Sequence, residues 1–284
     1  MPAQPLTEAA RAPSYYGKLP ARGDFVSRRF GRAFIEAWDA WLRSGLVASK
    51  AALGSAWRDL YLTSPIWRFA LAAGACGPNM AVGIMMPSVD AVGRYFPLVL
   101  GLEMPPNCDL GASVAAEGWY AALEALALAA LEDGFSLDRL DAPLCLSPLQ
   151  DLPLPRAGEG RGEGQLTAAP PHPSLSPEGR GFFGAAEGRG FCRRIALAET
   201  APLPPELCLR HMAQERATLW WSAGSERVAP SLLLCSGLPQ DAAFAALLDG
   251  DWRAHGWAEE AAPQSAAATA ADAGEDAMRW DREG

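Results

Sequence analysis

Two short segments of this sequence carry the charged side chains that could do chemistry. Residues 17–25 read GKLPARGDF, and residues 85–98 read MMPSVDAVGRYFPL. If the segments meet in the fold, their two aspartates form a pair of carboxylates, an arrangement suited to hydrolysis by general acid and base catalysis. The aspartates could instead form a buried ion-pair network with the two arginines, or present a surface to a partner. We take six side chains as candidate partner-binding residues: Lys18, Arg22, Asp24, Ser88, Asp90 and Arg94.

The rest of the sequence offers few other catalytic groups. It contains no Gly-x-Ser-x-Gly motif of a serine hydrolase. The six cysteines form no Cys-x-x-Cys pair and the three histidines are scattered, whereas zinc ligands usually cluster in pairs. Cys76 would need a histidine from elsewhere, such as His211, and a lone cysteine at the end of a strand usually serves packing. We therefore predict no catalytic residues, no metal and no cofactor.

The elements around the two segments predict that these segments lie together. The first segment follows a short strand at 15–18 and precedes a helix at 28–45, which Asp24 could cap. The second links strands at 80–86 and 95–103, and its hairpin length predicts that these strands pair antiparallel. Loops at one end of a sheet commonly carry function. We expect the loops at 20–25 and 87–94 to approach each other, with an ion pair between Arg22 and Asp90 or between Asp24 and Arg94.

The remaining periodicity predicts an α/β (α+β) fold with a largely antiparallel central sheet flanked by helices. In the first helix Phe30, Phe34, Trp38 and Trp41 share one face, and Gly45 is its expected stop. Asp241 is the expected N-cap of the last helix. Further helices are predicted at 49–61, 113–131, 203–213 and 242–248, and further strands at 66–72, 218–222 and 231–235, the last two forming a hairpin.

Composition divides the chain into one folded domain and three polar stretches. Residues 1–13 resemble a flexible leader, and residues 14–252 form the expected single domain. A stretch at 152–190 is rich in Gly and Pro and repeats the unit Glu-Gly-Arg-Gly, so we expect a disordered insertion there. Residues 258–284 carry five of the nine net negative charges and many alanines, so we expect a disordered acidic tail.

Charge and hydropathy predict the class of protein. The net charge of −9 argues against a general nucleic-acid surface. The N-terminus lacks the basic and apolar regions of a signal peptide, and no run of about 18 apolar residues would span a membrane. We therefore expect a cytoplasmic protein, in which disulfides are rare and the cysteines serve as small buried apolar residues.

Six motifs in order give the sequence a resemblance to a known family. They are the two segments above, WDAWL at 38–42, TSPIWRF at 63–69, LWWSAGSE at 219–226 and FAALLDG at 244–250. Together they resemble the TagF family, also called ImpM, which comprises accessory proteins of bacterial type VI secretion. The resemblance runs from about residue 15 to residue 252 and is interrupted between about 152 and 190.

The TagF/ImpM resemblance implies a compact domain of longin or profilin type and a function. Members are thought to restrain secretion after translation, and are linked to a cytoplasmic protein with a forkhead-associated domain and to its threonine-phosphorylation pathway. Some relatives fuse this domain to a phosphatase, an extension that we do not expect here. We expect a non-enzymatic regulatory protein; a hydrolase using the 22–25 and 88–94 loops is the alternative, and a structural assembly factor is the third.

Overall fold

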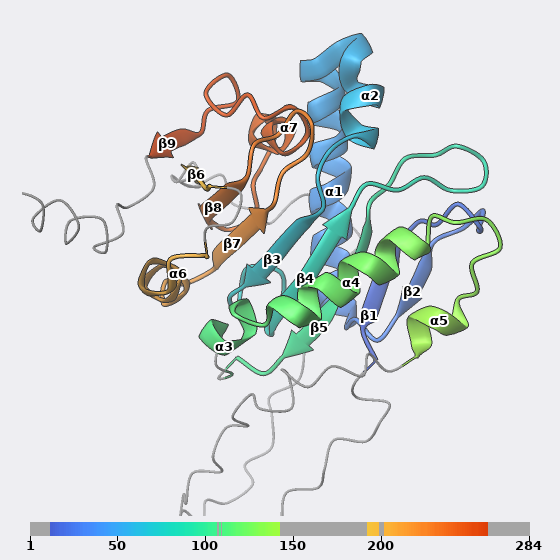
Figure 1. Cartoon of the computed structure of the whole chain (residues 1–284), viewed down its shortest axis with the longest axis horizontal. Helices are drawn as coiled ribbons and strands as arrows, with labels where there is room; N and C mark the ends of the chain where they lie inside the picture. The colour runs from blue at the N-terminus through green and yellow to red at the C-terminus, as the bar shows by residue number, and fades with distance from the viewer. Residues whose placement is uncertain (1–11, 107, 109, 143–191, 199–201, 261–284) are drawn as a thin grey trace, which may run out of the picture.

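The computed structural model describes residues 12–106, 108, 110–142, 192–198 and 202–260. In these residues nine strands form one sheet in the order β2-β1-β5-β4-β3-β7-β8-β6-β9 (Figure 1). All neighbouring pairs are antiparallel except β6 with β9, which confirms the largely antiparallel sheet. The strands are β1 (Ser14–Gly17), β2 (Val26–Arg28), β3 (Trp67–Leu71), β4 (Met80–Met86), β5 (Leu98–Met104), β6 (Cys192–Ala196), β7 (Ala217–Ser222), β8 (Ser231–Ser236) and β9 (Ala258–Glu260).

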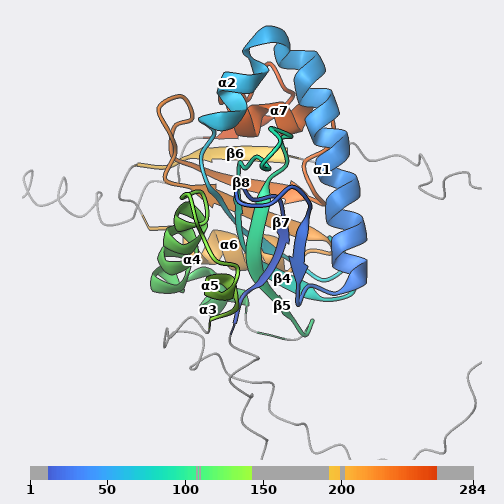
Figure 2. The ribbon, with the colours of Figure 1, turned by 90° about the vertical axis from the view of Figure 1, so that its right-hand side faces the viewer.

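Helices cover both faces of this sheet, so its central strands are buried on two sides. The helices are α1 (Arg32–Leu53), a 3-10 turn (Gly54–Ala56), α2 (Trp57–Leu62), α3 (Leu110–Val114), α4 (Glu117–Ala129), α5 (Asp138–Asp141), α6 (Pro205–Met212) and α7 (Ala242–Asp249). The cores on the two faces are separate: α1, α2 and α7 pack on one face, and α4 and α6 on the other (Figure 2). Strand β8 shows the alternation, because Leu233 and Cys235 join the first core whereas Leu232 and Leu234 join the second.

Helix α1 ends later than predicted, and its packing against α7 explains why. The aromatic stripe is buried as expected, but the helix continues through Gly45 to Leu53. A Cβ atom on Gly45 would lie 2.5 Å from Cδ2 of Phe244 on α7, so this glycine permits a close helix crossing. The expected stop at Gly45 was therefore wrong, and the helix ends instead at Gly54, whose φ of 54° favours glycine. Asp241 stands at the N-cap position of α7, as expected, but its side chain accepts no capping hydrogen bond.

The folded part of the chain extends beyond the expected domain end at residue 252. Strand β9 pairs in parallel with β6, from Arg193 opposite Ala258 to Ile195 opposite Glu260. The two glutamates of β9 form ion pairs with three arginines, so charge compensation holds a strand that has no apolar pattern of its own. The expected tail at 258–284 therefore begins too early. Residues 261–284 and the expected insertion at 152–190 lie outside the described residues.

Candidate functional site

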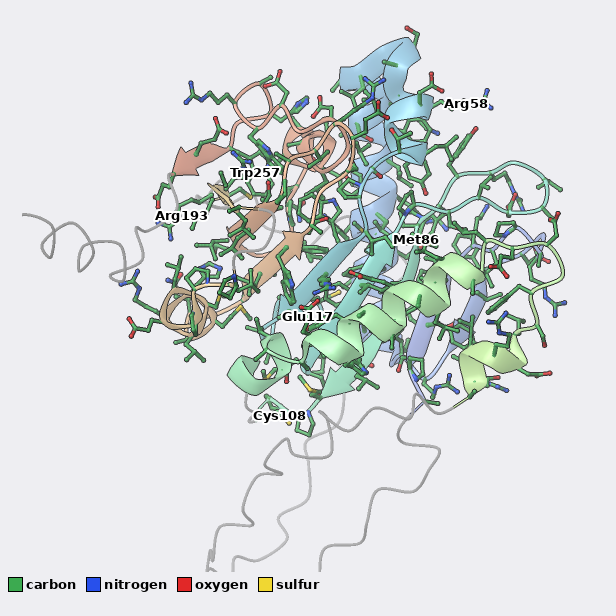
Figure 3. All side chains as sticks on the ribbon, viewed as in Figure 1. Arg58, Met86, Cys108, Glu117, Arg193 and Trp257 are labelled. Atoms are coloured by element: carbon green, nitrogen blue, oxygen red, sulfur yellow. The ribbon has the colours of Figure 1, made fainter. Side chains whose placement is uncertain are left out.

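The sheet brings the two sequence segments to the same end of its strands, as the sequence predicted. Strands β1 and β4 both pair antiparallel with β5, so they run in the same direction. The loop at 18–25 leaves the end of β1, and the loop at 87–97 leaves the end of β4 at Met86, which Figure 3 labels. The backbone N–H of Ala91 donates to the carbonyl oxygen of Arg22 at 2.9 Å, so the two loops are in direct contact.

Gly17 allows this close approach. Its φ is 140°, and a Cβ atom there would lie 2.8 Å from the Cα atom of Leu98 and against the carbonyl of Pro97. Any larger residue would force the first loop away from the start of β5. The motif glycine is therefore required by the contact between the two segments.

Asp90 is the centre of the site, and its carboxylate is fully buried. Oδ2 accepts hydrogen bonds from Lys18 Nζ and from Arg94 Nε, both at 2.7 Å. Oδ1 accepts from the backbone N–H groups of Val92 at 3.1 Å and of Arg94 at 2.8 Å. Burial by itself raises the pKa of Asp90, but these four donors outweigh it and hold the pKa well below its usual range. Lys18, Asp90 and Arg94 are called the Asp90 cluster below.

Two further residues fix the loops around the Asp90 cluster. Ser88 Oγ donates to the carbonyl of Lys18 at 2.7 Å, which ties the second loop to the first. The hydroxyl of Tyr61 on α2 donates to the carbonyl of Ser88 at 2.9 Å and accepts from its N–H at 3.0 Å. Sequence reasoning missed Tyr61, because nothing in the sequence indicated the partner of its hydroxyl group.

The expected ion pair between the loops is present, but with a different cation. Among the described residues neither Arg22–Asp90 nor Asp24–Arg94 forms, so both predicted pairs were wrong. Lys18 directly follows β1, and the strand places its ammonium under the second loop, whereas Arg22 lies at the exposed tip. Arg94 pairs with the aspartate of its own loop and reaches across to the carbonyl of Gly23. Asp24 is exposed and precedes β2, so its expected helix cap was wrong as well.

Apolar side chains are exposed directly beside these charges. Phe25 is 40% exposed and Val92 is 69% exposed, one from each loop. The ring of Phe25 stacks on Tyr16 at 5.5 Å between centroids and meets Phe96 edge-on at 4.8 Å. Lys18 Nζ lies 5.1 Å from the centroid of the same ring. The loop surface is defined below by five residues: Arg22, Asp24, Phe25, Val92 and Arg94.

Sequence reasoning placed neither Phe25 nor Val92 in the site. A signal was available, because an aromatic residue in a loop of Gly, Pro and charged residues has no helix or strand periodicity to bury it. Of the six candidates, the structure groups Lys18, Ser88, Asp90 and Arg94 through hydrogen bonds. It leaves the Arg22 and Asp24 side chains exposed on the rim.

This geometry suits binding better than acid and base catalysis. The buried Asp90 carboxylate already accepts four hydrogen bonds, whereas Asp24 is exposed to solvent. Cys76 and His211 do not meet either: Cys76 donates to the carbonyl of Phe34 in the α1 core, and His211 lies on α6 across the sheet. Burial and the charge of Glu103 raise the pKa of Cys76 to about 12, so its thiol is not a ready nucleophile.

A groove of about 690 Å³ lies elsewhere, between α3, α4, α6 and β7. Its polar lining includes Arg68, which forms ion pairs with Glu117 and Glu124 at 2.6 Å, and Figure 3 labels Glu117 at its rim. No lining residue comes from the loop surface. Within the described part of the chain, no three His, Cys, Asp or Glu side chains gather as metal ligands, and no helix is long and apolar enough to cross a membrane.

Comparison with known proteins identifies relatives of this architecture. A family model described as "TagF N-terminal domain, Type VI secretion system-associated" matches residues 14–145, which include both loops. The chain is 36% identical to PA0076 from Pseudomonas aeruginosa PAO1, whose crystal structure was determined at 2.05 Å resolution. That match covers 84% of this chain and 95% of the other, with a TM-score of 0.59. No curated protein matches the chain.

Proposed function

Because the chain belongs to the TagF family of type VI secretion system-associated proteins, we propose that it is a cytoplasmic regulatory protein that restrains this secretion after translation. In this proposal it acts by binding another component of the secretion machinery and performs no chemistry on it. A protein with a forkhead-associated domain is the proposed partner, as the family resemblance implies.

The loop surface is the observation that supports binding. Its exposed groups combine an aromatic ring, an aliphatic side chain, two arginines and an aspartate, the mixture typical of protein interfaces. The Asp90 cluster, in which Lys18 and Asp90 are buried, and the Tyr61–Ser88 hydrogen bonds hold the backbone of both loops before any partner arrives. Such a surface loses little conformational freedom on association, which favours affinity.

The hydrolase alternative has less support. It requires a carboxylate that can take up and release a proton beside a substrate, whereas Asp90 is buried, hydrogen-bonded and held as the anion.

The assembly-factor alternative would use the same loop surface but would make the protein necessary for secretion. A secretion assay distinguishes an assembly factor from the proposed restraining protein, because loss of a restraining protein raises secretion and loss of an assembly factor abolishes it.

A binding experiment tests the proposal directly. The double variant Phe25→Ala/Val92→Ala removes the apolar part of the loop surface while leaving the Asp90 cluster intact. We expect its affinity for the purified forkhead-associated-domain protein, measured by calorimetry, to fall at least tenfold, whereas the melting temperature should fall only slightly, through the lost contacts of Phe25 with Tyr16 and Phe96. Leu209→Ala is the matched control, because Leu209 is 51% exposed on α6, away from both loops.

The same variants are then placed in cells that lack the wild-type protein. The double variant should leave secretion unrestrained, whereas the Leu209→Ala control should restrain it as the wild type does. Unchanged binding and unchanged restraint in the double variant would show that the loop surface is not the binding site. Loss of activity in the Leu209→Ala variant alone would assign binding to the α6 face instead.

A further inference from the structure

Two cysteines face each other across neighbouring strands on the α1 side of the sheet. Cys192 on β6 is the Cα partner of Cys235 on β8. The N–H of Leu197 donates to the carbonyl of Pro230 at 3.0 Å, which places 197 and 230 at a hydrogen-bonded position of this ladder. Hydrogen-bonded positions alternate along antiparallel strands, so Cys192 and Cys235 occupy a non-hydrogen-bonded position.

This position has the dimensions that a disulfide needs. Residues at non-hydrogen-bonded positions have Cα atoms about 4.5 Å apart and side chains directed to the same face. Disulfides form across Cα separations of about 4.4–6.8 Å, so no backbone movement is required. Both cysteines are free thiols, and each perturbs the pKa of the other, as expected of thiols on facing positions.

The surroundings give the two thiols different roles. Cys235 is fully buried in the core with α1 and α7, and Thr218 of β7 lies opposite it on the other side. Cys192 is half-buried at the start of β6 and is therefore the sulfur that a reagent in solution reaches. Interaction with Cys235 lowers the pKa of Cys192, whereas burial raises the pKa of Cys235.

We propose that Cys192 and Cys235 are a redox-sensitive pair that closes into a cross-strand disulfide by exchange with a low-molecular-weight disulfide. The Cys192 thiolate attacks one sulfur of the external disulfide, forms a mixed disulfide and releases the first small thiolate. The Cys235 thiol loses its proton and attacks Cys192 Sγ, which breaks the mixed disulfide and releases the second small thiolate. The two small thiolates take up the two protons, so two protein thiols are oxidised and one external disulfide is reduced.

The disulfide would fasten one edge of the sheet. The final strand β9 pairs with β6, and β6 pairs in turn with β8 (Figure 1). A covalent bond between β6 and β8 would therefore hold the β6–β9 edge to the centre of the sheet. Figure 3 labels Arg193, which directly follows Cys192, and Trp257, which directly precedes β9.

The six cysteines of this chain make the disulfide simple to assign, because trypsin places each of them on a different peptide. The full chain is equilibrated with mixtures of reduced and oxidised glutathione, quenched in acid, alkylated and digested without reductant. We expect the peptide 190–193 to be linked to the peptide 228–253 in the oxidising mixtures, and the link to disappear with dithiothreitol. Recovery of both peptides alkylated at every mixture would overturn the proposal, as would a mixed glutathione adduct on Cys192 that never closes.

Two variants and a melting curve complete the test. Cys192→Ser should abolish the linked peptide, and Cys108→Ser, a control at another partly exposed cysteine, should retain it. Oxidised wild-type protein and oxidised C108S should melt several degrees above their reduced forms, whereas C192S should melt at one temperature in both buffers. Equal melting temperatures of oxidised and reduced wild-type protein would show that the disulfide does not stabilise the attachment of β6 and β9 to the sheet.

Discussion

Replacing Gly45 with alanine tests how the two ends of the chain form one domain. Gly45 lies on α1, in the region matched by the family model, and Phe244 lies on α7, near the end of the described chain. A Cβ atom at position 45 would lie 2.5 Å from Cδ2 and 2.6 Å from Cγ of Phe244. These distances are far inside ordinary carbon–carbon contact of about 3.5–4.0 Å, so the ring or a helix must move.

The magnitude follows from two opposing effects. Alanine is about 1 kcal/mol better than glycine in the interior of a helix. Overpacking a core typically costs about 1–3 kcal/mol, and the upper value applies here because Trp41 contacts the Phe244 ring, with 5.4 Å between centroids. We therefore expect Gly45→Ala to lower the free energy of unfolding by about 2 kcal/mol, a fall of about 4–8 °C in melting temperature.

A double-mutant cycle isolates the contact between α1 and α7. Chemical denaturation is followed by tryptophan fluorescence for the wild type, Gly45→Ala, Phe244→Ala and the double variant. Without the Phe244 ring, the new methyl group meets no obstacle, and only the higher helix propensity of alanine relative to glycine remains. We expect Gly45→Ala to be stabilising by about 1 kcal/mol in the Phe244→Ala background.

The reversal of sign is the decisive result. Destabilisation by Gly45→Ala in both backgrounds would mean that something other than the Phe244 ring occupies the space beside Gly45. Stabilisation in both backgrounds would mean that α1 and α7 do not pack closely. If the two ends form one cooperative unit, all four proteins unfold in a single transition.

Three further predictions concern the loops and the tail. The folded pKa of Asp90 lies below its unfolded value of about 4, so its contribution to stability is present above that pH and is lost as the pH falls. The urea midpoint should therefore fall more steeply in acid for the wild type than for Asp90→Asn. Parallel pH profiles of the two midpoints would contradict this prediction. Tyr61→Phe removes the acceptor of the buried Ser88 N–H and should cost about 1–3 kcal/mol in denaturant unfolding; an unchanged midpoint would mean that another group satisfies Ser88. A chain ending after Trp257 loses β9 and should melt a few degrees below a chain ending after Glu260, and equal values would show that β9 contributes no stability.

The sequence was sufficient to predict the parts of the fold that repeat a pattern. The apolar runs of β3, β4 and β5 indicated strands buried on both faces, and the short link between β4 and β5 indicated their hairpin. The approach of the two loops was predicted from their place at the end of one sheet, whereas the pairing of β1 with β5, which accounts for that approach, was not predicted. Antiparallel pairing with one shared neighbour sends the ends of β1 and β4 to the same edge.

Features that depend on contacts between distant segments could not be predicted in the same way. Lys18 and Arg22 both belong to the first loop, and only the path of the backbone after β1 decides which one reaches Asp90. Gly45 has the residue type of a helix end, and only the position of Phe244 shows that it marks a helix crossing. Strand β9 is too short and too polar to carry a pattern. It is held by pairing with β6, and its two glutamates form ion pairs with arginines outside the strand.

The order of the strands has a consequence for any shortened form of this protein. Five consecutive strands of the sheet, β2 to β3, come from residues before 105, and the other four come from residues after 191; β3 and β7 join the two groups. A fragment that ended after α5 would expose the edge of β3, whose Trp67, Phe69 and Leu71 are buried in the whole protein. An exposed apolar edge strand is a template for pairing with another chain. The first half alone would therefore be a self-associating species, and in the whole protein β7 covers the edge of β3.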